Sequence, residues 1–274
     1  MTDYNEYLAT GFRAVDSSRD LGKLSACLHF IEELPSFASY KTKSIERLYL
    51  KSGDVAVDLG CGLGFDVAKL ARVLSPNGKA IGVDASEQLL NAARQSFSYI
   101  DDIEFKQGDI HDLELPSNSI DGIRVDRVLQ HVRDPQKVIS EMVRVLKPEG
   151  WLVCAEPDWS TFVIDAEDDR IVDLVSEKWK NGFQNPWIGR QLLRRIREEK
   201  LQNTWVEGFV LLADGLSAVD SIYDLFSTVN KLKEHGLETS IELQEWVNQL
   251  RMRESIHGVT ASVTLFLVGG QKAI

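Results

Sequence analysis

The chain has 274 residues, of which 43% are hydrophobic and 27% charged, a composition typical of one globular domain with a substantial core. Its formal net charge of −11, from 42 acidic and 31 basic residues, disfavours nucleic acid and anionic membrane surfaces as partners.

The first predicted elements are helices. Within residues 1–50, Leu21, Leu24 and Leu28 recur at helical spacing before a break at Pro35. We expect this segment to form an N-terminal helical cap on the domain.

Strand and helix patterns then alternate from residue 54 onward. Strands are expected at Val55–Leu59, Ala80–Asp84, Ile103–Gln107, Gly122–Val125 and Trp151–Glu156. Helices are expected between them at Asp66–Leu74, Glu87–Phe97 and Pro135–Leu146. This order predicts an α/β fold with a parallel sheet and a ligand site at the carboxyl ends of the strands.

The C-terminal part of the chain is expected to add two strands with helices around them. The predicted helices are Asp168–Lys180, Gly189–Lys200, Leu216–Leu232 and Ser240–Ile256, and the strands are Thr204–Ala213 and Val259–Val268. The helical insertion at 214–257 is too long for an ordinary connection, so we expect a lid over the ligand. The core would then comprise residues 51–213 and 258–274.

The first strand ends in a glycine-rich turn, Asp58–Gly64, that opens directly into a helix. Alternate glycines let backbone N–H groups approach a ligand with no Cβ in the way. A dinucleotide fingerprint requires a glycine three residues after Gly62, where Phe65 stands. No Lys-Ser or Lys-Thr pair follows, so the phosphate loop of NTPases is also excluded.

The spacing Asp58-x-Gly60-x-Gly62-x-Gly64 resembles motif I of the class I S-adenosylmethionine (SAM)-dependent methyltransferases. Further passages follow in that family's order: Asp84, Asp109, Ile120-Asp121 and Arg144–Gly150. The resemblance covers about residues 50 to 156 and implies a Rossmann-like sheet of seven strands with SAM as cofactor. Glu149 stands where the family usually has glycine, which we expect to change only that turn.

Several residues are candidates for binding the cofactor. Asp84 ends the second strand about 24 residues after the first glycine, a placement from which a carboxylate accepts hydrogen bonds from ribose hydroxyls. Ala85 and Ser86 are assigned to the same loop, and Asp84 is also compatible with a role as helix cap. By resemblance, Asp109 and the backbone of Ile110 bind adenine.

Further residues complete the predicted cofactor site. Asp58, Gly60 and Gly62 belong to it through the turn, and Tyr40-Lys41, just before the first strand, is placed over the methionine end of SAM. Arg127 is expected to contact the ligand or organise its loop, because a guanidinium does not give up its proton.

His131 is the candidate general base, because an imidazole accepts a proton at neutral pH. The alternative is a histidine that only anchors its loop. Asp158 follows the fifth strand and is a candidate to orient His131 or the substrate. The alternative is that Pro157-Asp158-Trp159 forms a turn with a surface acid.

The passage His131–Pro135 resembles the ubiquinone/menaquinone-biosynthesis and natural-product small-molecule methyltransferases (methyltransferase domain types 11 and 25). The Asn-Pro-Pro-aromatic sequence of enzymes that methylate DNA bases or glutamine amides is absent. Aromatic residues of the flanks are candidates to line an acceptor site, with core packing as the alternative: Tyr4, Tyr7, Phe12, Trp179, Phe183, Trp187, Tyr223, Phe226 and Trp246.

The predicted function is in-line methyl transfer to an O, N or C nucleophile of a small, apolar metabolite. Three alternatives stay open: a SAM-binding protein without transferase activity, methylation coupled to cyclisation of a terpenoid or polyketide, and a Rossmann oxidoreductase.

Cysteine usage and the chain's start bear on location. Cys27, Cys61 and Cys154 lack C-x-x-C spacing and the five histidines are scattered, so we expect reduced thiols and no metal site. Neither a signal peptide nor a run of the ~20 apolar residues of a membrane span is recognisable. We expect a cytoplasmic enzyme whose partner is the methyl acceptor, and a homodimer is compatible with the sequence.

Overall fold

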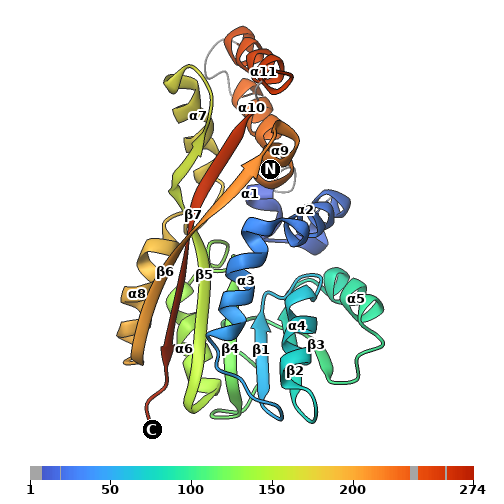
Figure 1. The fold of residues 1–274 in the computed structure, drawn as a ribbon, viewed down its shortest axis with the longest axis vertical. Helices are drawn as coiled ribbons and strands as arrows, with labels where there is room; N and C mark the ends of the chain where they lie inside the picture. The colour runs from blue at the N-terminus through green and yellow to red at the C-terminus, as the bar shows by residue number, and fades with distance from the viewer. Residues whose placement is uncertain (1–7, 19, 235–239, 257) are drawn as a thin grey trace.

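A seven-stranded sheet in the order β3-β2-β1-β4-β5-β7-β6 organises the chain (Figure 1). The computed structural model describes residues 8–18, 20–234, 240–256 and 258–274. The strands are β1 (Val55–Leu59), β2 (Lys79–Asp84), β3 (Ile103–Gln107), β4 (Ile120–Asp126), β5 (Leu146–Ile164), β6 (Gln202–Asp214) and β7 (Thr260–Gln271). Strands β1 to β5 pair in parallel, and β7 runs antiparallel to both β5 and β6. The predicted seven-stranded Rossmann-like α/β fold is therefore confirmed.

Helices cover both faces of this sheet. They are α1 (Leu8–Gly11), the 3-10 turn η1 (Val15–Ser17), α2 (Leu21–Glu33), α3 (Pro35–Glu46), α4 (Phe65–Leu74), α5 (Glu87–Ser96), α6 (Pro135–Val145), α7 (Asp169–Lys180), α8 (Ile188–Glu198), α9 (Leu216–Tyr223), α10 (Leu225–Glu234) and α11 (Ser240–Glu254). Because side chains alternate along β1, Ala56 packs with α4 on one face, whereas Val57 and Leu59 pack with α6 on the other. Across the described ranges, no helix is both long and apolar enough to cross a membrane.

Strand β5 is much longer than the strand predicted at Trp151–Glu156. It continues to Ile164 because β7 pairs with it across Asp158↔Thr264 and again across Val163↔Ser262, with an irregularity between. The alternative of a turn at residues 157–159 is therefore wrong. Strands β5, β7 and β6 rise past the ends of β1 and β4, with α7, α9, α10 and α11 at that end (Figure 1).

The insertion between β6 and β7 is helical, but the helix predicted at Leu216–Leu232 is two helices. It breaks at Asp224, which has a left-handed backbone with φ 48°. The Asp224 carboxylate accepts a hydrogen bond from the Leu8 N–H at 2.9 Å and forms an ion pair with Lys23 at 2.7 Å. This buried carboxylate therefore joins the insertion to the N-terminal helices.

Candidate active site

A cavity of about 810 Å³ lies at the carboxyl ends of β1, β2 and β4. The N-terminal segment closes one side through Phe12, Arg13 and Val15. The sequence-predicted residues in its wall are Asp58, Gly60, Gly62, Asp84, Ala85, Asp109, Ile110, Arg127 and His131. The structure thus gathers nine of the twelve candidates at one site and leaves Tyr40, Ser86 and Asp158 outside its wall.

The glycine turn is fixed to β2 by its own backbone. Gly60 has φ 65°, and a Cβ there would overlap the side chain of Val128. The N–H groups of Gly60 and Cys61 donate to the Val83 carbonyl at 2.7 and 3.1 Å, and that of Gly62 donates to Asp84 at 2.8 Å. These three N–H groups hold the turn in shape, contrary to our expectation that they would face a ligand.

Asp84 sits at the centre of this arrangement. Its Oδ2 accepts from Gly62, and its Oδ1 accepts from the Ser86 N–H at 2.9 Å. Burial raises the pKa of this carboxyl above its usual value. The Ser86 hydroxyl instead caps α5, accepting from the Leu89 N–H at 3.1 Å and donating to Asp16. Asp84 retains lone pairs for a ligand, whereas Ser86 is committed to the helix.

Asp109 lies in the same cavity wall, just after β3, which pairs with β2. Its carboxylate accepts from the His111 N–H at 2.9 Å and lies 2.5 Å from the His111 Nδ1, with Arg133 3.4 Å away. The backbone hydrogen bond from His111 is the largest cause of the lowered pKa of Asp109. Asp109 is therefore ionised and half-exposed, which suits it to accept a hydrogen bond from a ligand amine.

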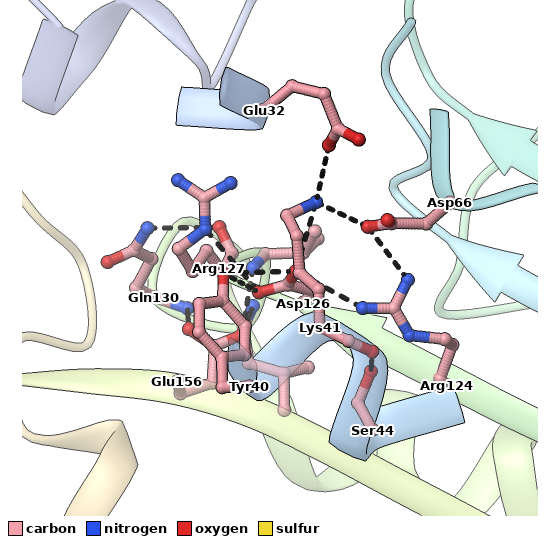
Figure 2. A network of polar contacts seen from close by, with 12 residues as sticks. Glu32, Tyr40, Lys41, Ser44, Asp66, Arg124, Asp126, Arg127, Gln130 and Glu156 are labelled. Atoms are coloured by element: carbon pink, nitrogen blue, oxygen red, sulfur yellow. Dashed lines mark hydrogen bonds and ion pairs between the residues drawn. The ribbon is translucent and has the colours of Figure 1, made fainter. Parts of the chain in front are cut away.

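A network of buried charges forms part of the cavity wall through Lys41, Asp58, Asp66 and Asp126. Figure 2 shows most of its members. Arg124 on β4 lies 3.0 Å from Asp58, 3.0 Å from Asp66 and 3.1 Å from Asp126. Burial raises the pKa of Asp58 to about 7 even beside Arg124. Asp66 also contacts Lys41, and these two cations hold its pKa well below the usual range although burial opposes them. Sequence reasoning missed this network, because its members lie on four separate elements.

Tyr40 belongs to the same network and does not cover the cavity. Its side chain is fully buried, and its hydroxyl donates to Asp126 at 3.1 Å. The neighbouring Lys41 is the residue of α3 that lines the cavity. The prediction that Tyr40 covers the methionine end of the cofactor is therefore wrong, because α3 turns its side chain toward the sheet.

The loop after β4, residues 127–132, carries His131 and is held from below by Glu156. The Glu156 carboxylate accepts backbone hydrogen bonds from Val128 at 2.8 Å, Leu129 at 2.6 Å and Gln130 at 3.3 Å. Burial raises its pKa to about 8. Sequence reasoning missed Glu156, although an acid at the end of the fifth strand was a recognisable signal.

Asp158 does not reach His131. Its carboxylate pairs with Arg190 on α8, with the Arg190 Nη2 at 2.8 Å, and accepts from the Ser160 N–H at 3.1 Å. Because β5 continues as a strand, Asp158 faces α8 while Trp159 faces the opposite side. The structure thus leaves Asp158 outside the walls of both cavities described here.

A second cavity, of about 50 Å³, adjoins the first. The two share Phe12, Arg127, Gln130 and His131 in their walls. Its aromatic lining is Phe12, Phe37, Trp159, Trp179, Phe183 and Tyr223. Of the flank aromatics considered above, Trp187, Phe226 and Trp246 lie elsewhere, and Tyr4 and Tyr7 fall outside the described residues. We call this second cavity the aromatic chamber. It is mostly apolar, with polar groups only where it meets the larger cavity.

His131 lies at that junction. Its ring is tilted against those of Phe12 and Phe183, with centroids 5.9 and 5.4 Å away. Burial, followed by the charges of Arg13 and Arg127, lowers the pKa of His131 to about 3. The imidazole is therefore neutral at physiological pH. In the described part of the chain, no three His, Cys, Asp or Glu side chains are placed to hold a metal.

Comparison with known proteins places this site in a family. The methyltransferase domain family matches residues 50–206. An uncharacterised 37.1 kDa protein of transposon Tn4556 from Streptomyces fradiae is 34% identical over 234 residues, covering 85% of this chain and 67% of that protein. A demethylmenaquinone methyltransferase of Oceanobacillus iheyensis is 31% identical over 127 residues, covering 46% of this chain and 53% of that enzyme. The match to that enzyme thus spans only about half its length.

Solved structures share the fold. A crystal structure of a putative methyltransferase from Bacillus halodurans has a TM-score of 0.62 at 18% identity and covers 86% of this chain and 100% of that one. Phosphoethanolamine N-methyltransferase 2 of Haemonchus contortus, solved in complex with S-adenosyl-L-methionine, has a TM-score of 0.62 at 16% identity and covers 98% of this chain and 61% of that one. The chain belongs to the class I SAM-dependent methyltransferases.

Proposed function

We propose that this protein binds SAM in the larger cavity and transfers its methyl group to a small, apolar acceptor at the junction of the two cavities, with part of the acceptor reaching into the second. The observation that carries the proposal is the shared wall of the two cavities at Phe12, Arg127, Gln130 and His131. A cofactor on one side of this wall and an acceptor on the other would meet where the few polar groups lie.

The larger cavity has groups suited to each part of the cofactor. Asp84 would accept hydrogen bonds from the ribose hydroxyls, and Asp109 with Ile110 would hold the adenine. Lys41 and the turn at Gly60–Leu63 would lie at the amino-acid end. When bound, SAM supplies a methyl group attached to a positively charged sulfur, and this sulfur is the leaving group, released as a neutral thioether. The chain's task is to align the acceptor with that methyl group and exclude water.

The apolar lining of the second cavity supports an apolar acceptor. Its wall offers ring faces and aliphatic side chains, which favour burial of apolar surface at about 25 cal/mol per Å². Ile222 and Tyr223 of α9 complete this wall, so the insertion at 214–257 would serve as part of the lid. The Oceanobacillus relative is named as a methyltransferase of demethylmenaquinone, which is consistent with such an acceptor.

Methyl-labelled SAM tests the proposal. The protein is incubated with labelled SAM and a panel of aromatic and isoprenoid acceptors, and products are identified by mass. We expect a labelled product and one S-adenosylhomocysteine for each methyl transferred. Phe183→Ala should raise the acceptor KM while leaving SAM affinity unchanged. Binding of SAM without S-adenosylhomocysteine release in any arm would instead favour a SAM-binding protein without transferase activity.

A further inference from the structure

Three side chains form a hydrogen-bond chain that ends at His131. The indole Nε1 of Trp159, on β5, donates to the Oε1 of Gln130 at 2.7 Å. The Nε2 of Gln130 lies 3.2 Å from the Nε2 of His131. These hydrogen bonds thus run from the wall of the aromatic chamber to the junction of the two cavities.

The direction of every bond in this chain is fixed by chemistry. An indole N–H can only donate, so the atom of Gln130 that faces Trp159 must be the amide oxygen. The amide nitrogen also donates to the carbonyl of Arg127 at 2.9 Å, and a carbonyl can only accept. Two neighbours therefore define the same amide orientation independently. The amide nitrogen then faces His131, and because it can only donate, the His131 Nε2 must accept.

A neutral imidazole that accepts at Nε2 carries its proton at Nδ1. We infer that Trp159 and Gln130 hold His131 in the Nδ1–H tautomer, so that His131 donates a hydrogen bond to the methyl acceptor and does not remove its proton. The role toward the acceptor rests on the proposed function, whereas the tautomer rests on the hydrogen bonds alone. Trp159 and Gln130 are positioning residues in this arrangement.

The surroundings of His131 agree with this assignment. Its Nδ1 is buried and has no hydrogen-bond partner within the described residues, so its proton is left for a group that enters the site. The low pKa of His131, which follows from burial near Arg13 and Arg127, excludes an imidazolium with a second N–H directed at Gln130. A base that must accept a proton at Nε2 would first have to displace the Gln130 amide.

Gln130 is also held by its main chain. Its N–H donates to Glu156 at 3.3 Å, and its carbonyl accepts from the N–H groups of Gln184 and Asn185 at 3.1 and 3.0 Å. The amide therefore projects from a rigid loop. A group that determines the tautomer of its neighbour has to be held in a fixed position.

This assignment narrows the acceptor class. The acceptor should carry a hydrogen-bond-accepting atom, such as a carbonyl, ether or phenolate oxygen or a ring nitrogen, beside its apolar ring. Its nucleophile should have no proton to lose, or should lose it without His131.

Nitrogen NMR on the full chain labelled with 15N-histidine tests the inference without any substrate. The His131 signals are assigned by their loss in His131→Asn. In the wild-type protein we expect a protonated, pyrrole-type Nδ1 and an unprotonated, pyridine-type Nε2 from pH 5.5 to 8. In Gln130→Glu, a carboxylate can only accept, so the two nitrogen types should exchange. Gln107→Glu, which adds the same charge to the same cavity wall, should leave them unchanged.

A wild-type His131 protonated at Nε2 would overturn the inference, as would an unchanged tautomer in Gln130→Glu. Gln130→Met provides a second variant, of similar size and with no donor, in case the buried charge prevents folding. It should move part of the protonated signal from Nδ1 to Nε2, and retention of the full Nδ1–H signal would also overturn the inference. Because no methyl acceptor is present, failure of the proposed function would leave these results unaffected.

Discussion

The guanidinium of Arg124 lies 3.0 Å from the carboxylate of Asp58, so a buried ion pair joins β4 to β1 directly below the glycine turn. The same guanidinium lies within 3.1 Å of Asp66 and Asp126. One cation thus neutralises charge on three elements that form the cavity floor.

Replacement of Arg124 by Met should strongly destabilise the fold. The change leaves three buried carboxylates without their common partner, and breaking a buried ion pair costs about 3–5 kcal/mol. Urea unfolding of Arg124→Met should show a loss of this size. Arg194→Met removes a cation from the exposed pair with Glu198 and should cost less than about 1 kcal/mol. Equal losses in the two variants would contradict a structural role for the buried network.

His131 should make the protein less stable in mild acid. Its pKa is about 3 in the folded state and near 6.5 when unfolded, so the unfolded chain binds the extra proton first. The contribution of the buried, neutral His131 to the free energy of unfolding is complete above pH 6.5 and is lost as the pH falls toward 3. Between pH 7 and pH 5 this loss is about 2 kcal/mol. The free energy of unfolding of wild type minus that of His131→Asn should fall by this amount over that range. A difference independent of pH would show that His131 is not buried as a neutral group.

Replacement of Glu149 by glycine should stabilise the fold. It has φ 65° in the turn before the body of β5, where the family usually has glycine. A left-handed conformation costs a residue with a Cβ about 1–2 kcal/mol, partly offset by the greater freedom of glycine in the unfolded chain. Glu149→Gly should therefore raise Tm by about 2 °C. Glu149→Ala keeps the Cβ and should give no gain, so an equal gain in both would exclude backbone strain as the cause.

The sequence predicted the features that local motifs determine. The turn at Gly60–Gly62, with Asp84 and Asp109 at the ends of their strands, was located because each follows a recognisable strand. The role of Glu156 was not, because its carboxylate binds the backbone of Val128, Leu129 and Gln130, which lie almost 30 residues earlier in the chain. The continuation of β5 beyond Glu156, which directs Asp158 to α8, was also missed, because it is decided by pairing with β7, roughly a hundred residues away. The charge network in the cavity wall likewise joins side chains on separate elements, and no local pattern reveals it.

Calorimetric titration with SAM tests the central claim most directly. Wild-type protein should bind one SAM per chain, and Asp84→Ala should bind it about 30- to 150-fold more weakly, because charge-assisted hydrogen bonds worth about 2–3 kcal/mol are lost. Asp101→Ala removes an exposed acid outside the cavity wall and should bind SAM as the wild type does. Absence of SAM binding by the wild type, or unchanged affinity in Asp84→Ala, would contradict the account.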